Sequence, residues 1–170
     1  MKKIVIIPGL GGKREDFDFI LKKIEKKHKI VVVLPDWKKT LSELEKMKIE
    51  ADIIIGYSLG ALLAYRISTK KKIDGLFLCS MSSILEDDFI NDVVDSVKSE
   101  LGFNWYDDLV NKKYGESKAS NIFSFYGKNE HPRMIRRAKM IGTSIVIDGC
   151  EHELNDKYLS RVLQELRHFI

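Results

Sequence analysis

The sequence has few cysteines and prolines: Cys79 and Cys150 are the only cysteines, and there are three prolines among 170 residues. Two cysteines without a Cys-x-x-Cys pair provide no disulfide framework, so we expect a protein of the reducing cytoplasm. They also offer little for a metal centre, and we expect no metal and no cofactor.

Long apolar runs are missing as well, and none approaches the length of a membrane span. The first run, residues 3–7, is too short for a signal peptide and leads directly into a glycine turn, which favours a first strand. We therefore expect no membrane partner.

The charge is only slightly unbalanced, with 29 Lys and Arg against 25 Asp and Glu, or +4. Its lysine doublets are scattered among acidic residues in separate predicted elements, which is typical of solvated helix faces. Because nucleic-acid binding needs basic residues clustered on one face, we do not expect a nucleic-acid partner.

Apolar runs alternate with helical patterns along the whole chain. With 44% hydrophobic residues, a chain of this length can build the core of a single domain. The predicted strands are 3–7, 30–34, 52–55, 73–79, 121–126 and 144–148; the predicted helices are 14–27, a short one at 40–47, 58–69, 132–140 and 154–169. This order predicts an α/β fold: a doubly wound, mainly parallel sheet of about six strands with flanking helices.

One interval is longer than a crossover helix requires. Around residues 81–118 an amphipathic pattern predicts a small helical lid inserted in the single domain 1–170. Phe103, Trp105 and Tyr106 follow that helix and either line an acyl pocket or simply pack against a neighbouring helix.

The sequence Gly56-Tyr57-Ser58-Leu59-Gly60 follows the predicted strand 52–55 and opens a helix. This is the pattern of a nucleophile elbow, a strand-to-helix turn so sharp that the serine hydroxyl stands above the sheet. In a parallel sheet, ligand sites lie beyond the carboxyl ends of the strands. Other reactive residues should therefore also follow strands.

A serine nucleophile needs a histidine base and an acid that orients it. Of the four histidines, His28 and His168 fall at the wrong edge of the sheet, and His131 adjoins Pro132 as a helix-start or pocket-rim residue. His152, in the loop after the last strand, is the base we predict.

Glu130 is the predicted acid because Gly127-Lys128-Asn129-Glu130 follows the neighbouring strand. Alternatives stay open: Asp148 at the strand end, Glu151 and Glu153 beside the histidine, and Glu86, Asp87 and Asp88 on another loop.

Acyl transfer also needs two backbone donors for the developing oxyanion. The amide of Leu59, at the start of the elbow helix, is one. The glycine-rich loop Pro8-Gly9-Leu10-Gly11-Gly12 suggests Leu10 as the other, with Gly11 as the alternative. It contains neither a dinucleotide-binding nor a P-loop glycine pattern.

These segments, in the order oxyanion loop, serine, acid and histidine, resemble the α/β-hydrolase superfamily along nearly the whole chain. The resemblance implies a sheet whose first three strands are ordered second, first, third, with the later strands following outward. Three features depart from the common pattern: Pro8 stands where many members have histidine, the acid is glutamate rather than aspartate, and the N-terminal antiparallel hairpin is missing.

The expected function is a serine hydrolase that cleaves a small-molecule carboxylic ester or thioester through an acyl-enzyme on Ser58. An alternative is an esterase or thioesterase for acyl chains bound to an acyl carrier protein, with the basic residues of 133–139 as the contact surface, although such a set is more often a solvated helix face. A second alternative is a binding protein that retains the fold without catalysis.

Overall fold

Six parallel strands form the sheet in the described part of the chain. The computed structural model describes residues 1–82, 101, 108 and 115–170. Within them the strands are ordered β2-β1-β3-β4-β5-β6, and every neighbouring pair is parallel. They comprise β1 (Lys3–Ile7), β2 (Lys29–Val32), β3 (Ile53–Tyr57), β4 (Ile73–Cys79), β5 (Ala119–Gly127) and β6 (Thr143–Ile147). The predicted α/β class and the predicted order of the first three strands are confirmed.

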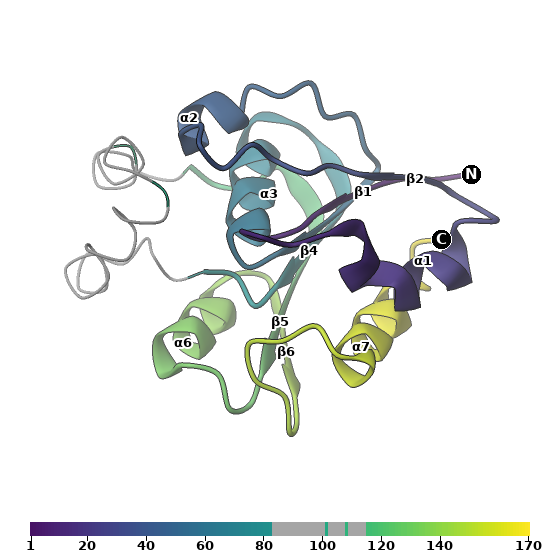
Figure 1. Ribbon diagram of the computed structural model, residues 1–170, viewed down its shortest axis with the longest axis vertical. Helices are drawn as coiled ribbons and strands as arrows, with labels where there is room; N and C mark the ends of the chain where they lie inside the picture. Colours follow the sequence, from purple (N-terminus) through teal and green to yellow (C-terminus); the bar gives the residue numbers. More distant parts are fainter. Residues whose placement is uncertain (83–100, 102–107, 109–114) are drawn as a thin grey trace.

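Helices cover both faces of this sheet (Figure 1). On one face lie α1 (Asp18–Ile24), which continues from the short 3-10 helix η1 (Arg14–Phe17), and α7 (Asp156–Leu166). On the other lie α2 (Leu41–Leu44), α3 (Leu59–Lys70) and α6 (Pro132–Met140). Among the described residues, none of these helices has both the length and the hydropathy that crossing a membrane would require.

The alternation of side chains along the strands explains the two layers of core. In β1, Ile4 and Ile6 pack with α1 and α7, whereas Val5 and Ile7 pack with α2 and α3. Each buried aliphatic side chain of this size contributes about 1.5–3 kcal/mol to folding. The continuous apolar run 3–7 therefore specifies a central strand that is buried on both faces.

Three predicted helices are shorter in the structure, and the one predicted at 154–169 is α7, Asp156–Leu166. The pattern over 14–27 forms η1 followed by α1, which ends at Ile24. The helix predicted at 40–47 is a single turn, α2, begun by a capping box in which Thr40 and Glu43 each accept a hydrogen bond from the other's backbone N–H. The predicted lid around 81–118 lies mostly outside the described residues, as do Phe103, Trp105 and Tyr106.

The sheet register brings the ends of β3, β4 and β5 together. Tyr57 pairs with Cys79, and Cys79 pairs with Phe125, so the residues that follow these strands lie side by side. The backbone N–H of Ser58 donates to the carbonyl of Cys79 at 2.9 Å, and that of Ser80 donates to the carbonyl of Phe125 at 2.8 Å. The carboxyl edge of the sheet is thus a continuous, hydrogen-bonded platform.

Candidate active site

Ser58 stands at the junction of β3 and α3 in a strained backbone conformation. Its φ of 53° and ψ of −120° lie outside the regions that non-glycine residues normally occupy. Glycine is required on either side because strand and helix converge there. A Cβ on Gly56 would lie 2.5 Å from the Cα of Ala61, and one on Gly60 would collide with the carbonyl oxygens of Ile7 and Pro8. The predicted elbow geometry is therefore present.

His152 lies beside Ser58, although the two are 94 positions apart in the sequence. Its Nε2 is 3.1 Å from the Oγ of Ser58, which is hydrogen-bonding distance. The loop after β6 carries the histidine, as the sequence predicts. A hydroxyl whose proton faces an imidazole nitrogen has the geometry that general-base activation requires.

Tyr57 holds this histidine in two ways. Its ring stacks on the imidazole with centroids 5.3 Å apart, and its hydroxyl donates to the backbone carbonyl of His152 at 3.1 Å. Burial, followed by the negative charge of Glu130, raises the pKa of Tyr57 well above its usual range, so the phenol stays protonated as a donor. Sequence reasoning passed over Tyr57, whose place directly before Ser58 in the Gly-x-Ser-x-Gly pattern was the available signal.

Glu130 lies near the other ring nitrogen of His152, the one that Ser58 does not contact. Its Oε2 is 3.7 Å from the Nδ1 of His152, close enough for an ion pair when the ring is protonated but longer than a good hydrogen bond. Its carboxyl group is fully buried. The other oxygen, Oε1, accepts hydrogen bonds from the N–H of Gly127 at 2.7 Å and from the hydroxyl of Ser80 at 2.5 Å.

The other candidate acids have different surroundings. Asp148 is exposed and forms an ion pair with Lys128 at 3.0 Å. Glu153 accepts a hydrogen bond from the side chain of Asn155 at 2.6 Å. Glu151 is exposed, and Glu86, Asp87 and Asp88 lie outside the described residues. Among the described candidate acids, Glu130 is thus the one whose carboxylate lies beside the imidazole of His152.

The remaining histidines lie apart from this arrangement. His131 precedes α6, and its Nδ1 accepts a hydrogen bond from the N–H of Arg133 at 3.3 Å, the helix-start position considered from the sequence. His28 precedes β2 and accepts from the N–H of Lys2 at 3.4 Å, at the amino edge of the sheet. His168 follows α7.

The glycine-rich loop after β1 borders the nucleophile. A Cβ on Gly9 would lie 3.0 Å from the Cβ of Ser58. The loop turns through a hydrogen bond from the N–H of Gly12 to the carbonyl of Gly9 at 3.1 Å, with Gly11 at a φ of 70°. That bond does not use the N–H of Leu10, and Leu59 is in the first turn of α3, where N–H groups have no intrahelical acceptor. The roles of both amides as oxyanion donors stay predictions.

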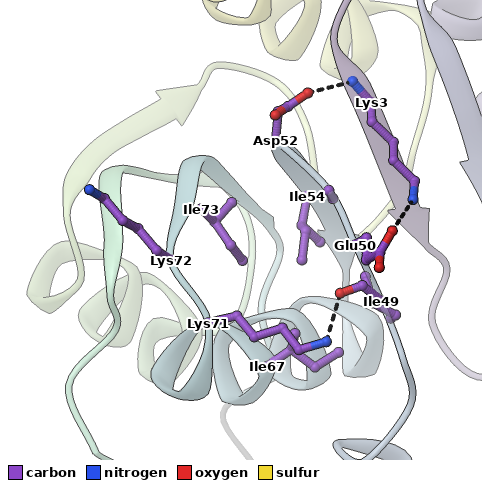
Figure 2. A pocket seen from close by; sticks show the side chains of 10 residues that line it. Lys3, Ile49, Glu50, Asp52, Ile54, Ile67, Lys71, Lys72 and Ile73 are labelled. Carbon is purple, nitrogen blue, oxygen red and sulfur yellow. Dashed lines mark hydrogen bonds and ion pairs between the residues drawn. The ribbon is translucent and has the colours of Figure 1, made fainter.

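A separate pocket of about 450 Å³ opens at the opposite edge of the sheet. Figure 2 shows Ile54, Ile67 and Ile73 inside it and lysine side chains around it. Lys3 pairs with Glu50 at 3.2 Å, and the ammonium of Lys71 donates to a backbone carbonyl. None of the predicted site residues lines this pocket. Nor, among the described residues, do three or more His, Cys, Asp or Glu side chains group so as to hold a metal ion.

A parallel sheet in this strand order, with a strained serine after its third strand, is the α/β-hydrolase fold. No protein-family model and no curated protein sequence matches the chain.

Solved structures do resemble it. A candidate hydrolase from Rickettsia typhi superposes with a TM-score of 0.62 at 14% identity, over 98% of this chain and 86% of the other. YbtT, a type II thioesterase of the yersiniabactin pathway, superposes with a TM-score of 0.56 at 15% identity, over 98% and 92%. RedJ, a thioesterase of prodiginine biosynthesis in Streptomyces coelicolor, gives 0.54 at 16%, over 96% and 89%. At these identities the likeness establishes the fold.

Proposed function

We propose that this protein is a serine hydrolase that cleaves a carboxylic ester or thioester through an acyl-enzyme on Ser58. The observation that carries the proposal is the 3.1 Å separation between the Oγ of Ser58 and the Nε2 of His152 on a strained elbow. The hydrolases and thioesterases among the structural neighbours support it.

The reaction follows from these positions. His152 Nε2 takes the proton of Ser58 as Oγ bonds to the substrate carbonyl carbon, and the amides of Leu10 and Leu59 stabilise the oxyanion. The imidazolium then protonates the departing alcohol or thiol, leaving an acyl ester on Ser58. Water, deprotonated by the same nitrogen, attacks that ester, and the imidazolium returns the proton to the Oγ of Ser58 as the acid is released. Glu130 orients the ring and stabilises its charge.

Covalent labelling tests this proposal directly. A fluorophosphonate probe should add one adduct mass to the intact protein, and the adduct should be absent from Ser58→Ala. Ser124→Ala is the control at a second serine, because Ser124 is buried in β5 and donates its hydroxyl hydrogen bond to the backbone carbonyl of Ile141. Failure of the wild-type protein to label, or labelling that survives Ser58→Ala, would refute the proposal and favour the alternative of a non-catalytic binding protein.

A second candidate is hydrolysis of acyl chains on an acyl carrier protein. Helix α6, which begins two residues after Glu130, carries four basic residues and no acidic one: Arg133, Arg136, Arg137 and Lys139. Two of the structural neighbours are thioesterases of biosynthetic pathways. This helix would receive an acidic carrier surface beside the site.

Charge reversal distinguishes the two substrates. The double variant Arg136→Glu, Lys139→Glu should slow hydrolysis of a carrier-bound thioester while leaving a small free ester unaffected. The control Lys26→Glu, Lys27→Glu reverses two exposed charges at the opposite edge of the sheet. Equal rates on both substrates in the α6 variant would contradict a carrier partner. A series of acyl chain lengths, tested as free esters and carrier thioesters, would define the preferred acyl group.

A further inference from the structure

A buried chain of hydroxyl groups lies behind Glu130. Ser80 directly follows β4, is 1% exposed and has a φ of 45°. Its Oγ lies 2.5 Å from Oε1 of Glu130 and 2.9 Å from the hydroxyl of Tyr158, a fully buried residue of α7. Ser80 is thus a second strained serine at the carboxyl edge of the sheet, next to the strand end that carries Ser58.

The direction of these hydrogen bonds follows from their chemistry. A carboxylate only accepts hydrogen bonds, so the hydroxyl of Ser80 donates to Glu130. Because that hydroxyl has a single hydrogen, Ser80 accepts from Tyr158. Burial raises the pKa of the Tyr158 phenol well above its usual range, which keeps its proton in place. The chain of donors runs from Tyr158 through Ser80 to Glu130.

We propose that Ser80 and Tyr158 are positioning residues that set both the orientation of Glu130 and the proton affinity of His152; this inference rests on the proposed function. The hydroxyl of Ser80 and the N–H of Gly127 both hold Oε1. The carboxyl group therefore cannot rotate without breaking two hydrogen bonds. Its other oxygen, Oε2, stays directed at the Nδ1 of His152. The strained backbone of Ser80 persists because the surrounding structure fixes it in place.

The same donors affect protonation. Each points a positive dipole at Oε1, which stabilises the negative charge of the Glu130–His152 pair before it takes up a proton. Removing a donor makes that state less stable, so the pair should bind its first proton at higher pH. A shift of the protonation of His152 can be attributed to the lost hydroxyl only if the other charged and titratable groups near Glu130 are unchanged in the variants.

Those groups come from several elements. The negative charge of Glu130 acts on Tyr57 of β3 and Cys79 of β4. Burial first, and then this charge, raise the pKa values of both residues, so both are neutral at working pH. The charges of Asp16 and Glu153 also reach Tyr57. None of these residues is altered when Ser80 or Tyr158 is replaced.

The test measures the pKa of His152 by NMR of the imidazole in the full-length protein. The variants are Ser80→Ala, Ser80→Gly and Tyr158→Phe, with Ser124→Ala as the buried-serine control. Ser80→Gly removes the hydroxyl while relieving the positive φ, so it reports on the chain even if Ser80→Ala folds poorly. The NMR titration does not depend on activity and is read whether or not Ser58 labels.

Both Ser80 variants should raise the pKa of His152 by about 0.5 to 1 pH unit, and Tyr158→Phe should raise it by less because it acts through Ser80. The acid limb of the fluorophosphonate labelling profile should move by the same amount, with a plateau roughly three- to tenfold lower. A pKa of His152 that equals the Ser124→Ala value, or falls below wild type, overturns the inference. Absence of wild-type labelling with the expected NMR shifts would refute the proposed function alone.

Discussion

Replacing Glu130 by glutamine removes the acid with almost no change of shape. Two donors, the N–H of Gly127 and the hydroxyl of Ser80, converge on Oε1 at 2.7 and 2.5 Å. The glutamine must turn its oxygen toward those donors, because its amide nitrogen cannot accept from either. The NH₂ group then faces the Nδ1 of His152 in place of Oε2.

We expect this substitution to reverse the tautomer of the base. The proposed mechanism uses the tautomer in which Nδ1 carries the proton toward Glu130 and Nε2 accepts from Ser58. Facing an amide NH₂, Nδ1 becomes the acceptor, and the imidazole proton moves to Nε2, where it blocks deprotonation of Ser58. The corresponding substitution in a Ser-His-Asp triad costs about 10⁴-fold, so we expect labelling of Glu130→Gln at neutral pH to fall by about 10³- to 10⁴-fold. Both hydrogen bonds to Oε1 survive, and the free energy of unfolding should change by less than about 1.5 kcal/mol.

The assay is the second-order rate of fluorophosphonate labelling, followed by intact mass, with urea unfolding measured on the same preparations. Glu153→Gln is the matched control, since Glu153 lies next to His152 in sequence but is exposed and bonded to Asn155. It should label at the wild-type rate. Wild-type labelling by Glu130→Gln, or an equal loss in Glu153→Gln, would refute the assignment of Glu130 as the orienting acid.

Three further results are expected. Gly60→Ala should lower the free energy of unfolding by about 3 kcal/mol or more in urea melts, because its Cβ would meet the backbone carbonyls of Ile7 and Pro8. The control Gly115→Ala, whose Cβ would have its nearest neighbour at 3.9 Å, should change the free energy of unfolding by under about 1 kcal/mol. Similar losses in both variants would contradict the steric argument. Tyr57→Phe should slow labelling roughly two- to fivefold, because the hydroxyl hydrogen bond to His152 is lost. Tyr57→Leu should slow labelling more, because the ring stack is lost too. A Tyr57→Leu variant that labels as fast as wild type would show that Tyr57 does not hold His152 in place. The free energy of unfolding should decline as the pH rises above about 9, because Tyr57, Tyr158 and Cys79 have raised pKa values in the fold and ionise at lower pH when unfolded. Tyr158→Phe should make this decline smaller in melts compared between pH 8 and pH 11. A decline equal to that of the wild type would contradict the contribution of Tyr158.

The strands were the most predictable part of the chain. Residues 3–7 are an apolar run, and residues 73–79 are apolar apart from Asp74 and Gly75; both segments match strands of the structure to the residue. The helix predicted at 132–140 also matches α6, because Pro132 marks its first turn. Ends without such a marker were less accurate, as in 14–27, where the pattern of buried residues continues through a 3-10 turn that periodicity does not distinguish.

The site was predictable to the extent that each residue follows a strand. That rule selected Ser58, His152 and Glu130, and it applies equally to Ser80, which directly follows β4. Tyr158 gave no signal, because a tyrosine on the apolar face of a closing helix looks like core. Hydrogen bonds between residues 78 positions apart, such as that between Ser80 and Tyr158, depend on packing that no local pattern encodes.

The place of β6 at the end of the strand order has a consequence for thermal inactivation. The loop that carries His152 follows β6, which among the described strands is hydrogen-bonded to β5 alone, whereas Ser58 follows β3, which has neighbours on both sides. An edge strand can detach in a partial opening that leaves the central strands intact, at a smaller free-energy cost than global unfolding. Such an opening would separate base from nucleophile while most of the sheet persists. On heating, labelling of Ser58 should therefore be lost some degrees below the melting temperature of the protein. The amide hydrogens of β6 should also exchange before those of β3.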